Sequence, residues 1–216
     1  MTSERAVCFD LDDTLYDYHE YAAAGLRSAA DLLESRTGLH LHDELDTLYF
    51  DEGVTEGTFD AILERYGLPD ALLEELVEAF HDSMEPMTPY ADAEPVLSLL
   101  GETDRLGLIT DGREGRAKLR RLGIDEHFDA VTVTPEIGRS KHEAVVFEQT
   151  LSKLSVAPEA ATYVGDDPRV DFRRPNELGM TTVRLRRGRY VDLDPSDPAA
   201  SPDYEVDNLG GLLSHL

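Results

Sequence analysis

The chain has 216 residues, of which 45 are acidic and 20 are basic, so its formal net charge is −25. A surface this acidic repels phosphates at long range, which argues against a nucleic-acid partner, and no apolar run approaches the roughly 20 residues that span a bilayer. The single cysteine, Cys8, excludes an intrachain disulfide and a cysteine-cluster metal site, and since no signal-peptide core is present we expect a cytoplasmic protein.

Lysine is scarce in this chain, whereas arginine is plentiful. Together with the acidic excess, this pattern favours a halophilic protein from a salt-rich cytoplasm, because salt screens the repulsion between surface carboxylates. We treat this as a hypothesis that the salt dependence of the melting temperature tests.

The first predicted strand, residues 7–9, runs directly into Asp10 and Asp12. Side chains two positions apart point the same way in extended backbone, so these two carboxylates can face one ligand while Leu11 faces the protein. Ligands of open parallel sheets collect at the carboxyl ends of strands, which makes both aspartates candidate catalytic residues. Taken alone, the same residues are equally consistent with a solvated acidic turn.

Residues 16–87 contain no convincing strand and several helical patterns, so we predict one helical insertion there. Apolar stripes at helical spacing follow one another up to residue 80, and the acidic residues between them are typical of solvated helix faces. The predicted organisation is therefore an α/β core made of residues 1–15 and 88–216, with a helical domain at 16–87.

From Pro89 onward, helices and strands alternate, which favours βα units and a parallel sheet. A segment rich in Pro, Ser and Asp at 192–203 is typical of a loop. The predicted strands of this part are 106–110, 130–133, 162–164 and 181–185.

In a parallel sheet, the loop after each strand lies at the same edge as Asp10. The second strand ends at Thr110, and Asp111 and Gly112 follow, which gives a hydroxyl and a close backbone approach suited to phosphate oxygens. Lys141 stands just before a predicted helix, where its ammonium can approach an anion. A turn with an exposed threonine and a surface lysine are the alternatives for these loops.

The loop after the strand at 162–164 offers three more carboxylates, Asp166, Asp167 and Asp171. Mg²⁺ prefers oxygen ligands and takes one or two carboxylates, with waters and substrate phosphate completing its shell, and Asp10 and Asp166 can supply the carboxylates. Asp171 can support Lys141 or a metal-bound water, or it can be the N-cap of a helix.

The order of these motifs along the chain is more specific than any one of them. Asp-x-Asp-x-Thr, then Thr-Asp-Gly, then an isolated Lys, then Gly-Asp-x-x-x-x-Asp resembles the haloacid dehalogenase-like (HAD) hydrolase superfamily over nearly the whole chain. The resemblance implies a Rossmann-like parallel sheet with helices on both faces and a helical cap at the insertion. One departure is His142, since many relatives carry proline after the motif lysine.

By this resemblance, Asp10 attacks phosphorus and forms an aspartyl-phosphate, while Asp12 protonates the leaving alcohol and then activates water. Asp10 must be ionised, which bound Mg²⁺ favours, and Asp12 must hold a proton near pH 7, which a crowded acidic site favours. Mg²⁺ would be bound by the Asp10 carboxylate, the backbone carbonyl of Asp12 and Asp166. The implied phosphate-binding residues are Thr110, Asp111, Gly112 and Lys141, and Asp167 and Asp171 are auxiliary.

The resulting prediction is a Mg²⁺-dependent phosphatase acting on a small phosphorylated substrate. Asp12 favours phosphoryl transfer over dehalogenation, because a halide leaves without a proton. A phosphomutase or phosphotransferase on the same scaffold is one alternative, and a non-catalytic or receiver-like phosphate-binding module is another. Neither the phosphate ester nor the choice between monomer and homodimer follows from the sequence.

Overall fold

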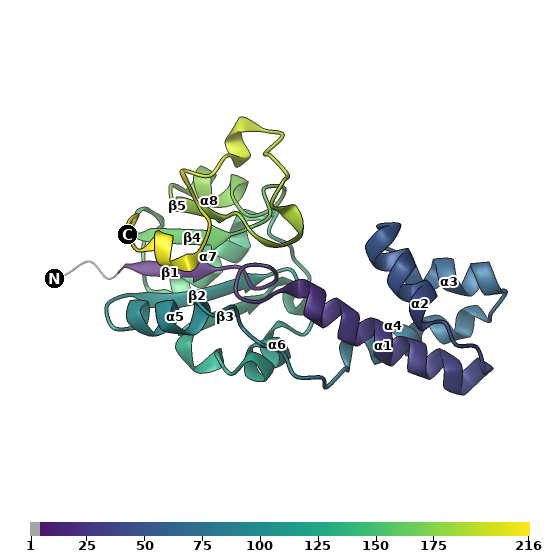
Figure 1. Cartoon of the computed structure of the whole chain (residues 1–216). Helices are drawn as coiled ribbons and strands as arrows, with labels where there is room; N and C mark the ends of the chain where they lie inside the picture. The colour runs from purple at the N-terminus through teal and green to yellow at the C-terminus, as the bar shows by residue number, and fades with distance from the viewer. Residues whose placement is uncertain (1–4) are drawn as a thin grey trace. The chain divides into compact units, whose positions relative to one another are not determined.

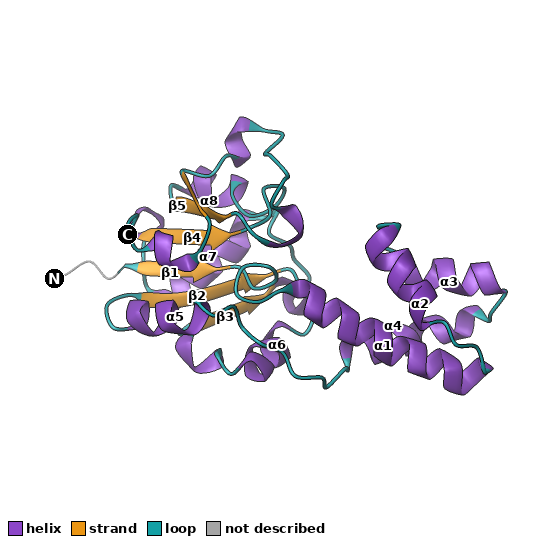
Figure 2. Cartoon of the chain, viewed as in Figure 1, coloured by secondary structure: helices purple, strands orange, loops and turns teal. Residues whose placement is uncertain are grey.

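The computed structural model describes residues 5–216. They form two compact units: an α/β unit made of the chain up to Tyr18 and of Met87–Leu216, and a helical unit, His19–Pro86. Figure 2 shows the strands in the α/β unit, whereas the described residues of the helical unit form only helices, turns and loops. No helix in the described range has both the length and the apolar character needed to cross a membrane.

The α/β unit contains one parallel sheet with strand order β3-β2-β1-β4-β5-β6. The central strand β1 pairs with β2 on one side and with β4 on the other, and all of its residues are buried. The strand order reverses beside β1, and such a reversal opens a crevice at the carboxyl ends of the strands. The predicted Rossmann-like fold is confirmed. The strands are β1 (Ala6–Phe9), β2 (Arg105–Thr110), β3 (Ala130–Val133), β4 (Ala161–Gly165), β5 (Thr181–Leu185) and β6 (Tyr204–Val206).

The last strand, β6, is absent from the sequence prediction, which ends its strands at residue 185. The reason is local, because β6 has only three residues, of which two are exposed. Such a segment has neither an apolar run nor a clear alternation, and its pairing with β5 is what makes it a strand.

Helices cover both faces of the sheet (Figure 1). Helices α5 and α9 contact each other on one face, and α7 and α8 contact each other on the opposite face. Close packing of α7 requires glycine at position 107, since a Cβ there would lie 2.8 Å from Cys8 Sγ and 3.1 Å from Leu154 Cδ1. The helices of this unit are α5 (Ala93–Gly101), α6 (Gly115–Leu122), α7 (Ala144–Leu154), α8 (Arg173–Leu178) and α9 (Leu209–Leu212).

The helical unit is built around an aromatic core. The ring of Phe80 lies edge-on to those of Tyr21 and Phe59, with centroid separations of 5.7 and 6.0 Å. Gly25 faces the same ring, and a Cβ at that position would lie 2.5 Å from it. The helices are α1 (Tyr18–Thr37), α2 (His42–Asp46), a π-helical turn (Thr47–Asp51), α3 (Thr58–Tyr66) and α4 (Leu73–His81).

Candidate active site

The carboxyl ends of β1, β2 and β4 bring the predicted motifs to one cavity of about 110 Å³ in the α/β unit. Asp10 follows β1, Thr110 ends β2 and Asp166 follows β4, so neighbouring strands hold all three residues. The backbone N–H of Asp10 still donates to the carbonyl of Val164 at 2.8 Å, which fixes Asp10 to the sheet. The lining residues are Asp10, Asp12, Thr110, Asp111, Gly112, Lys141, Asp166, Asp167, Val170, Asp171, Arg189 and Tyr190.

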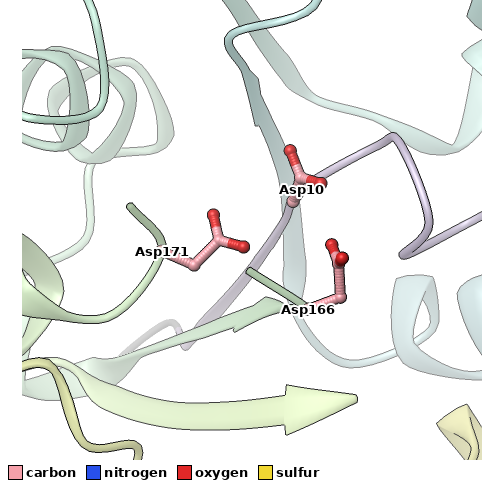
Figure 3. Close-up of side chains that lie close together, drawn as sticks. All are labelled: Asp10, Asp166 and Asp171. Atoms are coloured by element: carbon pink, nitrogen blue, oxygen red, sulfur yellow. The ribbon is translucent and has the colours of Figure 1, made fainter. Parts of the chain in front are cut away.

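Three buried carboxylates, Asp10, Asp166 and Asp171, point toward one another in this cavity (Figure 3). One oxygen from each lies within 4.8 Å of those from the other two. The hydroxyl of Thr14 donates to Asp166 Oδ1 at 3.1 Å, whereas Asp166 Oδ2 is buried without a hydrogen-bond partner among the described residues. Burial raises the pKa of Asp166 well above its usual value, and the charges of Asp10 and Asp171 add to the rise.

Lys141 is the cation of this cluster. Its Nζ donates to Asp171 Oδ1 at 2.8 Å and also to Asp10 Oδ1, and the lysine is almost fully buried. Burial alone would lower the pKa of Lys141, but the charges of Asp10 and Asp171 outweigh it and hold the pKa well above its usual value. Lys141 is therefore charged and neutralises part of the acidic cluster.

The carboxylate of Asp171 is held by donors on both oxygens. Tyr163 and Lys141 donate to Oδ1 at 3.1 and 2.8 Å, and the backbone N–H of Asp167 donates to Oδ2 at 2.9 Å. Gly165 makes this approach possible, since a Cβ there would lie 2.4 Å from Asp171 Oδ2. The N-cap of α8 is Phe172, so Asp171 supports Lys141 and does not cap the helix.

Asp10 differs from an ordinary aspartate in its proton affinity. Burial, together with the charges of Asp171 and Asp12, outweighs the opposing effect of Lys141 and raises the pKa of Asp10 to about 7. A divalent cation bound at the cluster would favour the ionised form that a nucleophile needs.

Asp12 lies apart from the three clustered carboxylates. Its Oδ1 accepts from Lys118 Nζ at 2.8 Å and from the hydroxyl of Tyr16. Burial raises the pKa of Asp12, but the charge of Lys118 and the hydrogen bonds from Lys118 and Tyr16 outweigh it and place the pKa below its usual value. The expectation that a crowded acidic site keeps a proton on Asp12 is therefore wrong for the resting protein.

The side chain of Asp12 consequently takes no part in the carboxylate cluster, whose third member is Asp171. The metal set implied by the resemblance uses only the backbone carbonyl of Asp12, so it is compatible with this arrangement.

Three of the four predicted phosphate-binding residues, Thr110, Asp111 and Gly112, lie at the end of β2 and in the loop that follows it. Thr110 Oγ1 accepts from the backbone N–H of Gly112 at 3.0 Å. The carboxylate of Asp111 accepts from the hydroxyl of Thr134 and, at 3.0 Å, from the backbone N–H of Lys141. The Asp111 side chain therefore anchors the lysine loop, and any contact of Asp111 with phosphate would come from its backbone.

The carboxylate of the remaining predicted residue, Asp167, forms an ion pair with a neighbouring arginine. Arg169 Nε and Nη2 donate to its two oxygens at 2.9 and 2.8 Å. Its carboxylate thus neutralises Arg169 and is not among the clustered carboxylates.

No role at the site was predicted from the sequence for Lys118, Arg184 or Arg189. The scarcity of lysine is a signal that could have drawn attention to Lys118. Arg184 has a signal too, because a charged residue inside a strand of apolar character is unusual. Arg189 has no such signal.

Arg184 joins two parts of the site. It is fully buried in β5, and its Nε donates to the carbonyl of Asp166 at 3.2 Å. Its Nη2 donates to the carbonyls of Tyr190 and Leu193 at 2.7 and 2.6 Å, which fixes the following loop. From that loop, Arg189 Nε reaches Asp13 Oδ2 at 2.5 Å.

The chain is similar to known proteins over nearly its whole length. The sequence profile of haloacid dehalogenase-like hydrolases matches residues 7–185. Glyceraldehyde 3-phosphate phosphatase from Methanopyrus kandleri is 37% identical over 222 residues, covering 97% of this chain and 95% of that protein. Ribulose-1,5-bisphosphate 5-phosphatase from Halopiger xanaduensis is 31% identical over 234 residues, covering 96% and 97%. The crystal structure of a HAD phosphatase from Thermococcus onnurineus gives a TM-score of 0.69 at 26% identity, covering 98% of this chain and 97% of that one.

Proposed function

Because the chain belongs to the haloacid dehalogenase-like hydrolase family, we propose that it is a Mg²⁺-dependent phosphatase that forms an aspartyl-phosphate on Asp10. Family membership confirms the resemblance that the order of the motifs indicates. The relatives named above are phosphatases, and this chain is likewise a phosphoric monoester hydrolase.

The buried carboxylate of Asp10 carries the proposal. It lies at the carboxyl end of the central strand, lines the cavity and is bonded to Lys141. A fixed carboxylate beside a cation can attack phosphorus while the cation lowers the repulsion between the two anions.

Asp12 is assigned the proton transfers. In the first step, Asp10 bonds to phosphorus, the ester P–O bond breaks, and Asp12 protonates the leaving oxygen. In the second step, water attacks phosphorus and gives a proton to Asp12. The bond between Asp10 and phosphorus breaks, which frees the Asp10 carboxylate and inorganic phosphate.

The low pKa of Asp12 suits the second step, in which it acts as a base. For the first step, the negative charge of a bound phosphate raises its pKa, so the proton arrives with the substrate or is taken up as the substrate binds.

The carboxylate cluster fits Mg²⁺. It offers hard oxygen donors, and Asp166 Oδ2 is buried without a partner among the described residues, which is costly unless a cation is bound. Asp10, Asp166 and the backbone carbonyl of Asp12 would hold the ion. When bound, Mg²⁺ would neutralise charge on the carboxylates and on the phosphoryl oxygens.

Thr110 and Lys141 are assigned to the phosphoryl oxygens, with the backbone at 111–112. Lys141 brings a full charge to a buried position, and Thr110 brings a hydroxyl at the end of the neighbouring strand. Such donors favour the spread of negative charge in the transition state of phosphoryl transfer.

The substrate class proposed is a small phosphorylated metabolite, in line with the phosphorylated sugars in the names of the two phosphatases. The helical unit is assigned the role of the cap, which excludes water and selects the leaving group. The core and cap of this proposal are residues 1–15 with 88–216, and residues 16–87.

Phosphate release from a panel of sugar phosphates, nucleotides and small organic phosphates tests the proposal. We expect release that requires Mg²⁺, stops with EDTA, and leaves a phosphorylated Asp10 that can be trapped by acid quenching and identified by mass spectrometry. Quantitative isomerisation of a sugar phosphate without release of phosphate would instead establish a mutase. Activity that ignores EDTA would overturn the metal requirement.

A further inference from the structure

Lys118 is a buried lysine that none of the motifs includes. It lies in α6, is 2% exposed, and places its Nζ 2.8 Å from Asp12 Oδ1. Its basic neighbours Arg116 and Arg120 are both exposed, as is usual on a surface helix. Burying a lysine costs desolvation energy, so the contact with Asp12 needs an explanation beyond the packing of α6.

Tyr16 approaches the same oxygen from another element. Its hydroxyl donates to Asp12 Oδ1, and its side chain is fully buried. Its backbone is held by bridges to Asp12 and Pro89, so the hydroxyl has little freedom. Asp12 Oδ1 therefore accepts two donors whose positions are fixed independently.

The other oxygen of Asp12 has different surroundings. Among the described residues, no hydrogen bond reaches Asp12 Oδ2, and that atom is not among the fully buried polar atoms that lack a partner. It lies against Gly112, where a Cβ would come within 2.4 Å of Oδ2 and 3.1 Å of Lys118 Nζ. The glycine thus leaves room for both the carboxylate and the lysine beside the cavity.

We propose that Lys118 and Tyr16 are positioning residues that hold Asp12 by Oδ1, so that Oδ2 carries out both proton transfers. This inference rests on the proposed function. When the ester P–O bond breaks and the Asp10–phosphorus bond forms, the proton on Oδ2 passes to the leaving oxygen. When water attacks the aspartyl-phosphate, Oδ2 takes a proton from that water as the bond to Asp10 breaks, which restores the starting state.

Holding one oxygen is compatible with both protonation states. Oδ1 can accept from Lys118 and Tyr16 whether or not a proton is on Oδ2, so the carboxyl group does not rotate between the two steps. A freely rotating carboxyl group would spend part of its time with its proton directed away from the leaving oxygen.

The test compares two esters in Lys118→Met and Tyr16→Phe. An alkyl phosphate needs a proton on its leaving oxygen, whereas p-nitrophenyl phosphate does not, and kcat/KM reports only the steps up to release of the alcohol. We expect Lys118→Met to lower kcat/KM for the alkyl ester by about 10²-fold and Tyr16→Phe by about 10-fold, with the aryl ester changed by less than about 5-fold. Lys153→Met, which removes an exposed lysine on α7, is the matched control and should change neither value.

A second comparison separates positioning from structural damage. In an Asp12→Asn background, Lys118→Met should cost less than about 3-fold on either ester, because the proton transfer is already lost. Equal losses on both esters, or a full loss in the Asp12→Asn background, would show a purely structural role and overturn the inference. If Lys118→Met does not fold, the comparison of the two esters in Tyr16→Phe decides the inference, since this variant removes only a single hydroxyl.

Failure of the proposed function has a different signature. If Asp10→Asn retains wild-type activity, the aspartyl-phosphate mechanism is wrong and the inference is overturned with it. If activity depends on Asp10 but Lys118→Met and Tyr16→Phe change kcat/KM equally for both esters, only the assignment of Lys118 and Tyr16 is overturned.

Discussion

The two units of the chain differ in whether their charged side chains are buried. In the helical unit, the buried polar side chains are Thr58 and Ser83, and ion pairs such as Arg27 with Glu85 are about half exposed. The α/β unit instead buries carboxylates, lysines and an arginine. Among its described residues, the buried charged ones are Asp10, Asp13, Asp104, Lys118, Lys141, Asp166, Asp167, Asp171 and Arg184.

The difference shows where this protein gives up stability for chemistry. An exposed ion pair contributes about 0–1 kcal/mol and costs little to form, whereas a buried charge must be compensated for lost solvation. The helical unit avoids that cost with an aromatic core around Phe80. Most of the buried charges of the α/β unit lie at the carboxyl edge of its sheet, where a reactive site needs them.

Replacing the proposed nucleophile should give the largest effect on activity. Asp10→Asn is expected to lower phosphate release by about 10⁴-fold or more, because the attacking oxygen is lost. The melting temperature of the metal-free protein should not fall, since the variant removes a charge that burial destabilises. Steady-state kinetics and calorimetry measure the two quantities, and a large drop in melting temperature would show that Asp10 stabilises the fold.

Removing a cation from each unit compares the two kinds of ion pair directly. Lys141→Met should lower the free energy of unfolding by about 3–5 kcal/mol, because it leaves two buried carboxylates without their cation. Arg27→Met, the control in the helical unit, should cost at most about 1 kcal/mol. Urea unfolding gives both values, and similar costs for the two variants would contradict the contrast between the units.

Metal binding should depend on pH. The pKa of Asp10 is raised from 3.8 to about 7, so the folded state retains this proton and the group lowers stability as pH rises through that window. Mg²⁺ binds the ionised form, so its stabilising effect should grow from pH 5 to pH 8. At about 100 times Kd it amounts to ~2.7 kcal/mol, or roughly 5–10 °C in melting temperature.

The control for this measurement is Asp166→Asn, which should lose the Mg²⁺ effect at every pH because the unpartnered oxygen is replaced. A Mg²⁺ effect that is independent of pH in the unmodified protein would show that Asp10 does not bind the ion.

Salt should give the smallest effect. Both units carry exposed carboxylates, and molar KCl screens their repulsion, so the melting temperature should rise by roughly 2–5 °C between low and molar KCl. Differential scanning fluorimetry measures the shift. A melting temperature that does not change with KCl concentration would contradict the hypothesis of a halophilic protein.

The α/β fold and the placement of the motifs followed from the sequence for a simple reason. Each strand of the site is a short apolar run that ends at a polar cluster, and the carboxyl ends of parallel strands must share one edge. Asp10, Thr110 and Asp166 could therefore be grouped without coordinates. The short strand β6 could not, because its exposed residues carry no periodic signal.

The direction of a charged side chain is harder to predict than its position in the chain. Asp12 and Asp171 both stand in motifs, yet Asp171 joins the clustered carboxylates while the side chain of Asp12 is bonded to Lys118. The direction of each carboxylate depends on its hydrogen-bond donors, which are Tyr163 in β4 for Asp171, and Tyr16 and Lys118 for Asp12.

In the sequence by itself, the order of the motifs determined the family. Hydrophobic periodicity and strand ends determined the sheet and the edge where the motifs meet, because both are local properties of the chain. Tertiary structure alone decided which charges are neutralised and by which partner. Lys118 is the clearest case, since its helix carries four basic residues and the fold buries this one against Asp12. That outcome depends on the packing of α6 beside Gly112, where two distant parts of the chain meet.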